Sequence, residues 1–247
     1  MSCRGIFLAA CVCVAQVRGD SATPTVSSNV GDRDQAGLEL AEKVRSMAPR
    51  ENSTASGVLK IRDREGKISE VPVACQVIAG GQSWQIVYEA KGSAASEKLT
   101  ILHAPNRPNE YLYAKPANAT PRKLTGKEAA IPLAGSDFWL SDLGLEFLHW
   151  PKQRLLKTEM RSSRWCNKLE SINPTPASGN YARVQSWLDK ESGAPIMAEG
   201  YNAANQKVKE FAIKSVWKES GQPKEIEMHS VQTKSRTWLQ FDSNNIK

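Results

Sequence analysis

The sequence has few of the residues from which active sites are usually built. Its 247 residues include only three histidines, His103, His149 and His229, which are far apart along the chain. It contains no Gly-x-Ser-x-Gly or His-Glu-x-x-His motif and no glycine-rich loop that would bind a phosphate. We therefore predict that the protein is not an enzyme and that it uses no metal ion or other cofactor.

The sequence also lacks a concentrated patch of charge. Its formal net charge is +7, but lysine and arginine are spread along the chain, and the densest basic stretch contains only Arg161, Arg164 and Lys168. A protein that binds nucleic acid usually carries a basic stripe or patch, so we predict no nucleic-acid partner. A mild positive charge favours approach to anionic lipid headgroups, and it is equally compatible with an ordinary solvated surface.

Long hydrophobic runs are missing except at the N-terminus. Residues 5–17 form an apolar run that follows Arg4 and precedes a polar stretch, which is the pattern of a secretory signal peptide. The run is shorter than the roughly 20 residues that a membrane-spanning helix needs. We predict a signal peptide over residues 1–19, a flexible leader over residues 20–31, and a single β-rich domain over residues 32–247 of an exported protein.

The same leader offers a second interpretation. Leu8-Ala9-Ala10-Cys11 resembles a bacterial lipobox, in which the cysteine becomes the lipid-anchored N-terminus. Cleavage before Cys11 would leave only about six apolar residues upstream of the cut, fewer than the usual apolar core of a signal peptide. A lipid anchor at Cys11 is therefore the less favoured alternative to simple export.

Cysteine is nearly absent from the predicted domain. Cys3, Cys11 and Cys13 lie in the leader, and only Cys75 and Cys166 remain. Two cysteines in an oxidising compartment can form a disulfide, which would close a long loop and contribute on the order of 4 kcal/mol. The alternative is two separate buried thiols that behave as small hydrophobic side chains.

Most of the remaining sequence alternates apolar and polar residues, as half-buried antiparallel strands do. An amphipathic helix is predicted first, starting at Asp32 and stopped by Pro49. The strand-like runs that follow are residues 57–63, 68–79, 84–89, 98–104, 110–115, 165–172, 181–189, 194–201, 207–218, 223–231 and 235–242. They predict a meander of about ten or eleven strands, in which neighbours in sequence pair.

The middle of the chain breaks this alternation. Large apolar side chains crowd into a short stretch, with Gly144 in its midst and Pro151 at its end. The most prominent of them are Phe138, Leu140, Leu143, Phe147 and Trp150. The break predicts two short helical turns, and a segment so apolar must cover another surface or be covered itself.

From residue 136 onward the sequence resembles the bacterial outer-membrane lipoprotein-sorting proteins, the LolA-like family. The resemblance rests on Gly135-Ser136-Asp137-Phe138, Trp165-Cys166-Asn167-Lys168-Leu169-Glu170, Tyr181-Ala182-Arg183-Val184-Gln185-Ser186-Trp187-Leu188-Asp189, Gly193-Ala194-Pro195-Ile196-Met197, and residues 223–241 with Ile226-Glu227-Met228. Their order and spacing match the family over about half of the chain, whereas residues 32–135 agree with it only in layout.

The resemblance implies an α+β fold, a mostly antiparallel unclosed β-barrel whose concave face is covered by helices. It also implies a periplasmic carrier that shields the acyl chains of a lipid or lipoprotein during transfer to the outer membrane. Its partners would be the acylated cargo, an inner-membrane release complex and an outer-membrane acceptor. No catalytic residues follow from the resemblance.

On this hypothesis the five crowded residues, Phe138, Leu140, Leu143, Phe147 and Trp150, form a lid, and the N-terminal helix plugs the barrel. The residues expected to line the lipid cavity are Trp84, Ile86, Phe211, Ile213 and Trp217. Ordinary core packing is the alternative for each of them. Two other functions stay open: a non-catalytic sensing or scaffold domain of the cell envelope, which predicts a filled barrel, and a secreted hydrolase, which predicts a polar cleft.

Overall fold

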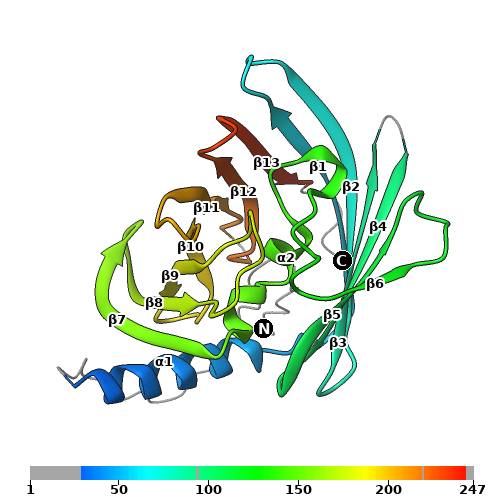
Figure 1. Ribbon diagram of the computed structural model, residues 1–247. Coiled ribbons are helices and arrows are strands. Elements are labelled where there is room, and N and C mark those ends of the chain that lie inside the picture. The colour runs from blue at the N-terminus through cyan, green and yellow to red at the C-terminus, as the bar shows by residue number, and fades with distance from the viewer. Residues whose placement is uncertain (1–28, 93–94, 219, 243–247) are drawn as a thin grey trace.

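The computed structural model describes residues 29–92, 95–218 and 220–242. These residues form one strongly curved antiparallel sheet, an N-terminal helix, and a helical segment in the middle of the chain (Figure 1). The strands are β1 Ser53–Arg62, β2 Ile68–Ile78, β3 Trp84–Lys91, β4 Ser96–Ala104, β5 Arg107–Ala114, β6 Arg122–Leu124, β7 Lys152–Arg161, β8 Arg164–Ile172, β9 Arg183–Asp189, β10 Pro195–Tyr201, β11 Lys207–Val216, β12 Pro223–Ser230 and β13 Ser235–Phe241.

The order of the strands shows how the sheet is built. It runs β6-β5-β4-β3-β2-β1-β13-β12-β11-β10-β9-β8-β7, so the first and last strands meet in the middle. Leu59 of β1 lies opposite Leu239 of β13. The chain lays down β1 to β6 outward on one side, crosses to the far edge, and returns inward from β7 to β13. Because β6 and β7 are the two edges, the barrel is not closed.

The predicted fold class is therefore confirmed, with thirteen described strands in place of ten or eleven. The two strands that were not predicted are β6 and β7. β6 has only three residues, too few to show an alternation. β7 has two adjacent leucines, Leu155 and Leu156, and its pairing with β8 shifts register between Leu155 and Lys157. This irregularity interrupts the two-residue alternation of apolar and polar residues, so the strand is not recognisable from the sequence.

The helix α1, Val30–Arg45, starts two residues before the predicted Asp32. Its N-cap is Asn29, whose side-chain Oδ1 accepts a hydrogen bond from the Gly31 backbone N–H at 3.0 Å. The last residues assigned to the flexible leader thus belong to the helix. The predicted signal peptide, residues 1–19, and the cysteines Cys3, Cys11 and Cys13 lie outside the described residues.

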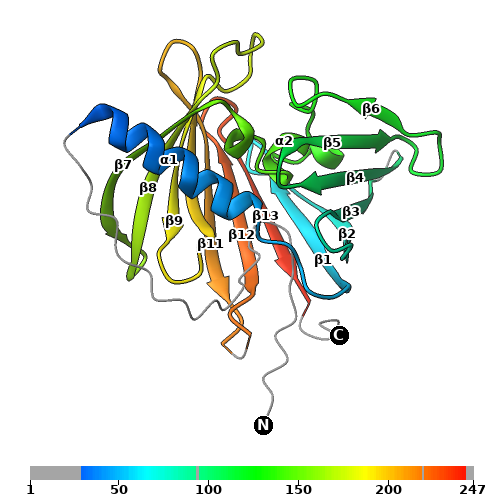
Figure 2. The same ribbon diagram turned by 90° about the horizontal axis from the view of Figure 1, so that it is seen from below.

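The helix α1 lies across the open, concave side of the sheet, next to β7 (Figure 2). It approaches β7 at Gly37, where a Cβ atom would sit 2.6 Å from the Arg154 backbone. One turn earlier, Asp34 Oδ1 accepts a hydrogen bond from Arg154 Nε at 2.6 Å. The missing side chain of Gly37 therefore allows the close approach, and the helix covers the opening.

The main core lies between the concave face of the sheet and the helical segments. Its largest fully buried side chains include Tyr88, Tyr111, Phe138, Leu59 and Leu140. A second, smaller cluster contains Cys166, Trp187 and Ile196. In the described part of the chain no helix is long and apolar enough to cross a membrane.

The disulfide considered from the sequence is wrong, and the alternative of two separate buried thiols is confirmed. Cys75 of β2 belongs to the main core, whereas Cys166 of β8 belongs to the second cluster. Six strands lie between β2 and β8 in the sheet. The two sulfur atoms are therefore held apart by the sheet itself.

Candidate functional site

A helical segment fills the hollow of the half barrel, and we call residues 133–150 the covering segment. It comprises the 3₁₀ turn η1 Leu133–Gly135, the short helix α2 Leu140–Leu143 and the 3₁₀ turn η2 Glu146–His149. Figure 1 shows α2 inside the arch of strands. The two short helical turns expected from the sequence correspond to α2 and η2, which lie on either side of Gly144.

Four of the five predicted lid residues point into the core. Phe138 is 1% exposed and Leu140 is fully buried, and Leu143 and Phe147 are also buried. Trp150 is half-buried and lines an open cleft on the outer side of the segment. The covering segment is therefore part of the core, because its apolar side chains occupy the concave face of the sheet.

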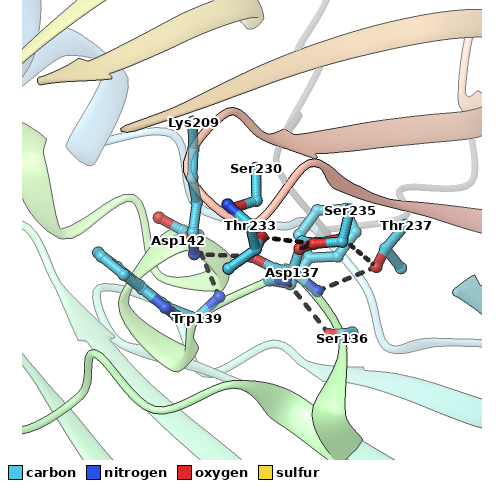
Figure 3. Close-up of polar contacts among 10 residues, drawn as sticks. Ser136, Asp137, Trp139, Asp142, Lys209, Ser230, Thr233, Ser235 and Thr237 are labelled. Carbon is cyan, nitrogen blue, oxygen red and sulfur yellow. Dashed lines mark hydrogen bonds and ion pairs between the residues drawn. The ribbon is translucent and has the colours of Figure 1, made fainter. Parts of the chain in front are cut away.

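Polar contacts attach one end of the covering segment to the last strand (Figure 3). The Asp137 backbone N–H donates to Thr237 Oγ1 at 2.9 Å, and the Thr237 hydroxyl donates to Asp137 Oδ2 at 2.8 Å. Ser235 Oγ donates to the other carboxylate oxygen of Asp137. Thr237 is fully buried, so these bonds satisfy groups that have no access to water.

Lys209 of β11 provides a second attachment next to the first (Figure 3). Its Nζ donates to the Asp137 carbonyl oxygen at 2.7 Å and lies 3.4 Å from Asp142 Oδ2. It also lies 3.5 Å from the centre of the Trp139 ring. Burial lowers the pKa of Lys209 to about 8, although Asp142 opposes this shift. Nearby carboxylate, carbonyl and ring electrons thus compensate a buried ammonium group.

The other end of the covering segment is attached to β5 and β7. Asn109 Nδ2 donates to the Gly144 carbonyl oxygen at 2.7 Å, and Tyr111 Oη donates to Glu146 Oε2 at 2.8 Å. Gln153 Nε2 donates to the carbonyl oxygen of Phe147 at 2.9 Å. Burial raises the pKa of Glu146 to about 7, and the Tyr111 hydrogen bond opposes this shift.

Two small cavities remain beside the covering segment. The first has a volume of about 70 Å³ and lies where α1, β3, β4 and β10 approach the covering segment. The second, of about 30 Å³, lies between the covering segment and strands β9 to β12. Leu145 and Pro195 line both cavities. Leu145 has a left-handed backbone with φ 48°, a conformation that costs energy for a residue other than glycine.

The predicted lining residues are divided among these places. Trp84 and Ile86 line the first cavity, and Phe211 lines the second. Ile213 packs against both core clusters and lines a separate pocket together with Ser162, Ala194 and Ile196. Trp217 lies beyond the end of β11, with the Lys224 ammonium 4.9 Å from its ring centre. Their role in holding a lipid stays a prediction.

Sequence reasoning missed the polar residues that hold the covering segment. The signal was present in the strand alternation, because each of them takes an inward position that an apolar residue would usually fill. Lys209 has the same parity as Phe211, and Thr237 has the same parity as Leu239. A polar residue at an apolar strand position indicates a buried partner, but the sequence does not say which one.

Comparisons with solved structures agree with this half barrel covered by helices. A putative outer membrane lipoprotein-sorting protein domain from Vibrio parahaemolyticus superposes with a TM-score of 0.69 at 19% identity. A DUF1329 family protein from Desulfovibrio piger gives 0.68 at 16% identity, and a LolA superfamily protein from Nitrosomonas europaea gives 0.57 at 16% identity. Each alignment covers 85% of this chain and 92% of the other.

The fold is thus that of the lipoprotein-sorting proteins, which confirms the resemblance noted from the sequence. The sequence model of a family described as "Uncharacterized protein" matches residues 85–247, and the chain belongs to this family. No curated protein matches the chain in sequence. Within the described ranges, no group of three or more His, Cys, Asp or Glu side chains is arranged to hold a metal ion.

Proposed function

We propose that the protein is a non-catalytic periplasmic carrier that shields the acyl chain of a lipid or lipoprotein on the concave face of its half barrel. The conformation described above is then the closed form, in which the covering segment lies on this face. The observation that carries the proposal is that the concave face is covered by a separate segment, attached through polar contacts at Asp137, Lys209 and Asn109. A segment of this kind can leave without breaking the sheet.

The energetics explain why an empty carrier would need such a segment. Each buried methylene is worth about 0.8 kcal/mol, so a chain of sixteen carbons resists exposure to water by roughly 12 kcal/mol. An apolar face that binds this chain is itself unstable in water. In the closed form Phe138, Leu140 and Leu143 shield it, and the cargo would take their place.

The two cavities are too small for cargo while the segment is in place. An apolar cavity of about 150 Å³ holds one benzene molecule, whereas the cavities beside Leu145 measure about 70 and 30 Å³. Displacement of Leu145 would join them, since it lines both. The strained backbone at Leu145 favours this displacement, because leaving the left-handed conformation releases energy.

The names of the similar structures support the cargo class. Two of them are described as a lipoprotein-sorting protein domain and a LolA superfamily protein. We propose by analogy that the cargo is lipid or lipoprotein, loaded from an inner-membrane release complex and passed to an outer-membrane acceptor.

Uptake of a fluorescent fatty acid by protein purified without detergent tests the proposal. We expect binding by the wild type, and at least a fivefold loss in Ala104→Leu, which places a larger side chain in the first cavity. Ala204→Leu, in the exposed β10–β11 turn, is the matched control and should bind normally. Native mass spectrometry of the same preparation would reveal co-purified lipid. Absence of both co-purified lipid and uptake would contradict the proposal.

The alternative function is a sensing or scaffold domain, and the filled interior favours it. A domain that works through its surface has no need of a removable segment. It would instead use the open cleft of about 490 Å³ outside the covering segment, which Trp139, Trp150 and Tyr181 line. This function would be favoured if the wild type binds no fatty acid and the amide hydrogens of the covering segment exchange as slowly as those of the central strands.

A further inference from the structure

The first cavity differs from the second in the polar atoms without a hydrogen-bond partner that its lining residues carry. In the described part of the chain, three of the buried side-chain atoms without a hydrogen-bond partner belong to residues that line it: Arg45 Nε, His103 Nε2 and Asn109 Oδ1. His149 lines it as well. Buried polar atoms usually have partners, so the two of these atoms that can donate a hydrogen bond, Arg45 Nε and His103 Nε2, indicate that the cavity accommodates an acceptor.

The surroundings hold these groups in place. Arg45, the last residue of α1, donates a hydrogen bond from Nη1 to the Leu148 carbonyl oxygen. The His103 ring stacks on Trp84, with 5.2 Å between ring centres and an angle of 13° between the planes. Burial lowers the pKa of His103 and the Asn109 side chain opposes this shift, but His103 Nε2 makes no hydrogen bond of normal geometry within the described residues.

The charges around the cavity are of one sign. Arg45 is a permanent cation, and His103 and His149 can each accept a proton. None of the lining residues, all of which lie in the described ranges, is an aspartate or a glutamate. The carboxylate that acts on the pKa of Arg45 is that of Glu42 on the same helix. Glu42 is exposed to solvent. A site with this composition fits an anion.

The rest of the lining is apolar. It consists of Val44, Met47, Trp84, Ile86, Leu143, Leu145 and Leu148, together with small residues. Beyond Leu145 lies the second cavity, whose lining is mostly apolar, with Phe211, Val184 and Met228, and includes the ion-paired Lys209 and Asp142 at one side. An anionic group placed at Arg45 would therefore have an apolar path leading away from it.

We propose that the first cavity binds the anionic end of a single-chain amphiphile, a fatty-acid carboxylate, held by Arg45, His103 and His149. Its hydrocarbon chain then runs past Leu145 into the space of the second cavity. This inference rests on the proposed carrier function and specifies its ligand class.

The protonation of the histidines gives the inference a second signature. Burial lowers the pKa of His103 to about 4. The pKa of His149 is also lowered to about 4, first by burial and then by the charges of Arg45 and His103. Both rings are thus neutral at pH 6 before an anion binds. Neither Glu146 nor Asp142, the carboxylates of the covering segment, lines this cavity. A bound carboxylate favours the protonated rings, so binding takes up protons.

Titration calorimetry with three probes, decanoate, decanol and inorganic phosphate, tests the inference. At pH 6 we expect decanoate to bind wild type at least tenfold more tightly than decanol does. We also expect proton uptake, detected by repeating the titration in buffers of different ionisation enthalpy. Arg45→Gln and His103→Phe should each reduce the preference to threefold or less, because each removes a group that binds the carboxylate. Phenylalanine is chosen at position 103 because it keeps the stacking on Trp84. His229→Phe, on β12, is the control and should keep the full preference.

The outcomes separate the two proposals. Equal binding of decanoate and decanol would overturn the anion site and leave the carrier function standing. Binding of neither decanoate nor decanol would overturn both. Binding of phosphate that depends on Arg45 and is as tight as that of decanoate would assign the cavity to a free anion, and would overturn the amphiphile.

Discussion

Asp137 and Thr237 lie 100 residues apart in the sequence and exchange two hydrogen bonds in the core. One residue belongs to the covering segment and the other to β13, a central strand of the sheet. The pair therefore ties the part of the molecule that we expect to move to a part that we expect to stay fixed.

Asp137→Ala should weaken this tie. The change removes the carboxylate that accepts from Thr237 and Ser235 and leaves the buried Thr237 hydroxyl without its acceptor, so we expect a loss of about 2–3 kcal/mol in the free energy of unfolding. Hydrogen exchange of residues 133–150 should become faster, and that of β1 should change little. Asp63→Ala, in the exposed β1–β2 turn, should cost less than 1 kcal/mol. Equal effects of the two changes would contradict a specific role for Asp137.

Glu146 should make the stability of the protein depend on pH. Its pKa is about 7 in the folded protein, against an ordinary value of 4.5 for a glutamate carboxyl. Between pH 4.5 and 7 the unfolded chain releases this proton and the folded protein keeps it, so this contribution to stability falls as the pH rises and is fully lost above pH 7. The loss should be on the order of 3 kcal/mol.

The measurement is urea unfolding of wild type and Glu146→Gln at pH 5 and pH 8. Glutamine does not titrate, so Glu146→Gln should lack this loss of stability between pH 5 and pH 8. Its amide oxygen still accepts a hydrogen bond from the Tyr111 hydroxyl. The titrations of His103 and His149 are common to both proteins and cancel in the comparison. Glu65→Gln, on the exposed β1–β2 turn, should behave as wild type. The same pH dependence in wild type and Glu146→Gln would refute the assignment.

Gly144→Ala should displace the covering segment from β5. A Cβ atom there would lie 2.3 Å from Tyr111 Oη, and the backbone φ of −95° allows alanine. The cost therefore comes from the contact alone, and we expect about 1–3 kcal/mol in the free energy of unfolding. Gly31→Ala, in the first turn of α1, has only an ordinary contact at 3.6 Å and should not destabilise the protein. A neutral Gly144→Ala would show that Tyr111 moves aside freely.

Cys75 and Cys166 should be unreactive in the folded protein. Burial raises the pKa of Cys75 to about 12, and burial followed by the charge of Asp189 raises that of Cys166 to about 11. The thiolate is the reactive form, so a thiol reagent should label neither residue until the protein unfolds. A protein in which Cys3, Cys11 and Cys13 are replaced by serine allows the count, and both thiols should react in guanidinium chloride. Labelling of one thiol at full rate in the native state would contradict its burial.

The sequence predicts the strands of the sheet well, but it does not predict how the covering segment is attached to them. Alternation reveals a strand such as β11, because Phe211 and Ile213 recur at every second position. The crowded apolar residues around Leu143 likewise indicate a segment that must be buried. These signals are local, and each is contained in about ten residues.

The missing information concerns pairs that are distant in sequence. Nothing near Asp137 indicates that its partner is Thr237, and nothing near Arg45 indicates that it shares a cavity with His103. The inward position of Lys209 indicates a buried partner, but it does not identify Asp142 as that partner. Such contacts follow from the order of strands in the sheet, which alternation alone does not determine.

The meeting of β1 and β13 in the middle of the sheet has a consequence for how the molecule reaches its native state. Each half is a meander of local hairpins that can form early, but the strand pair that joins the halves requires both ends of the chain. Closing so long a loop makes this step slow. We therefore expect the two halves to remain unjoined, and open to exchange and proteolysis, until synthesis and any translocation of the polypeptide are complete.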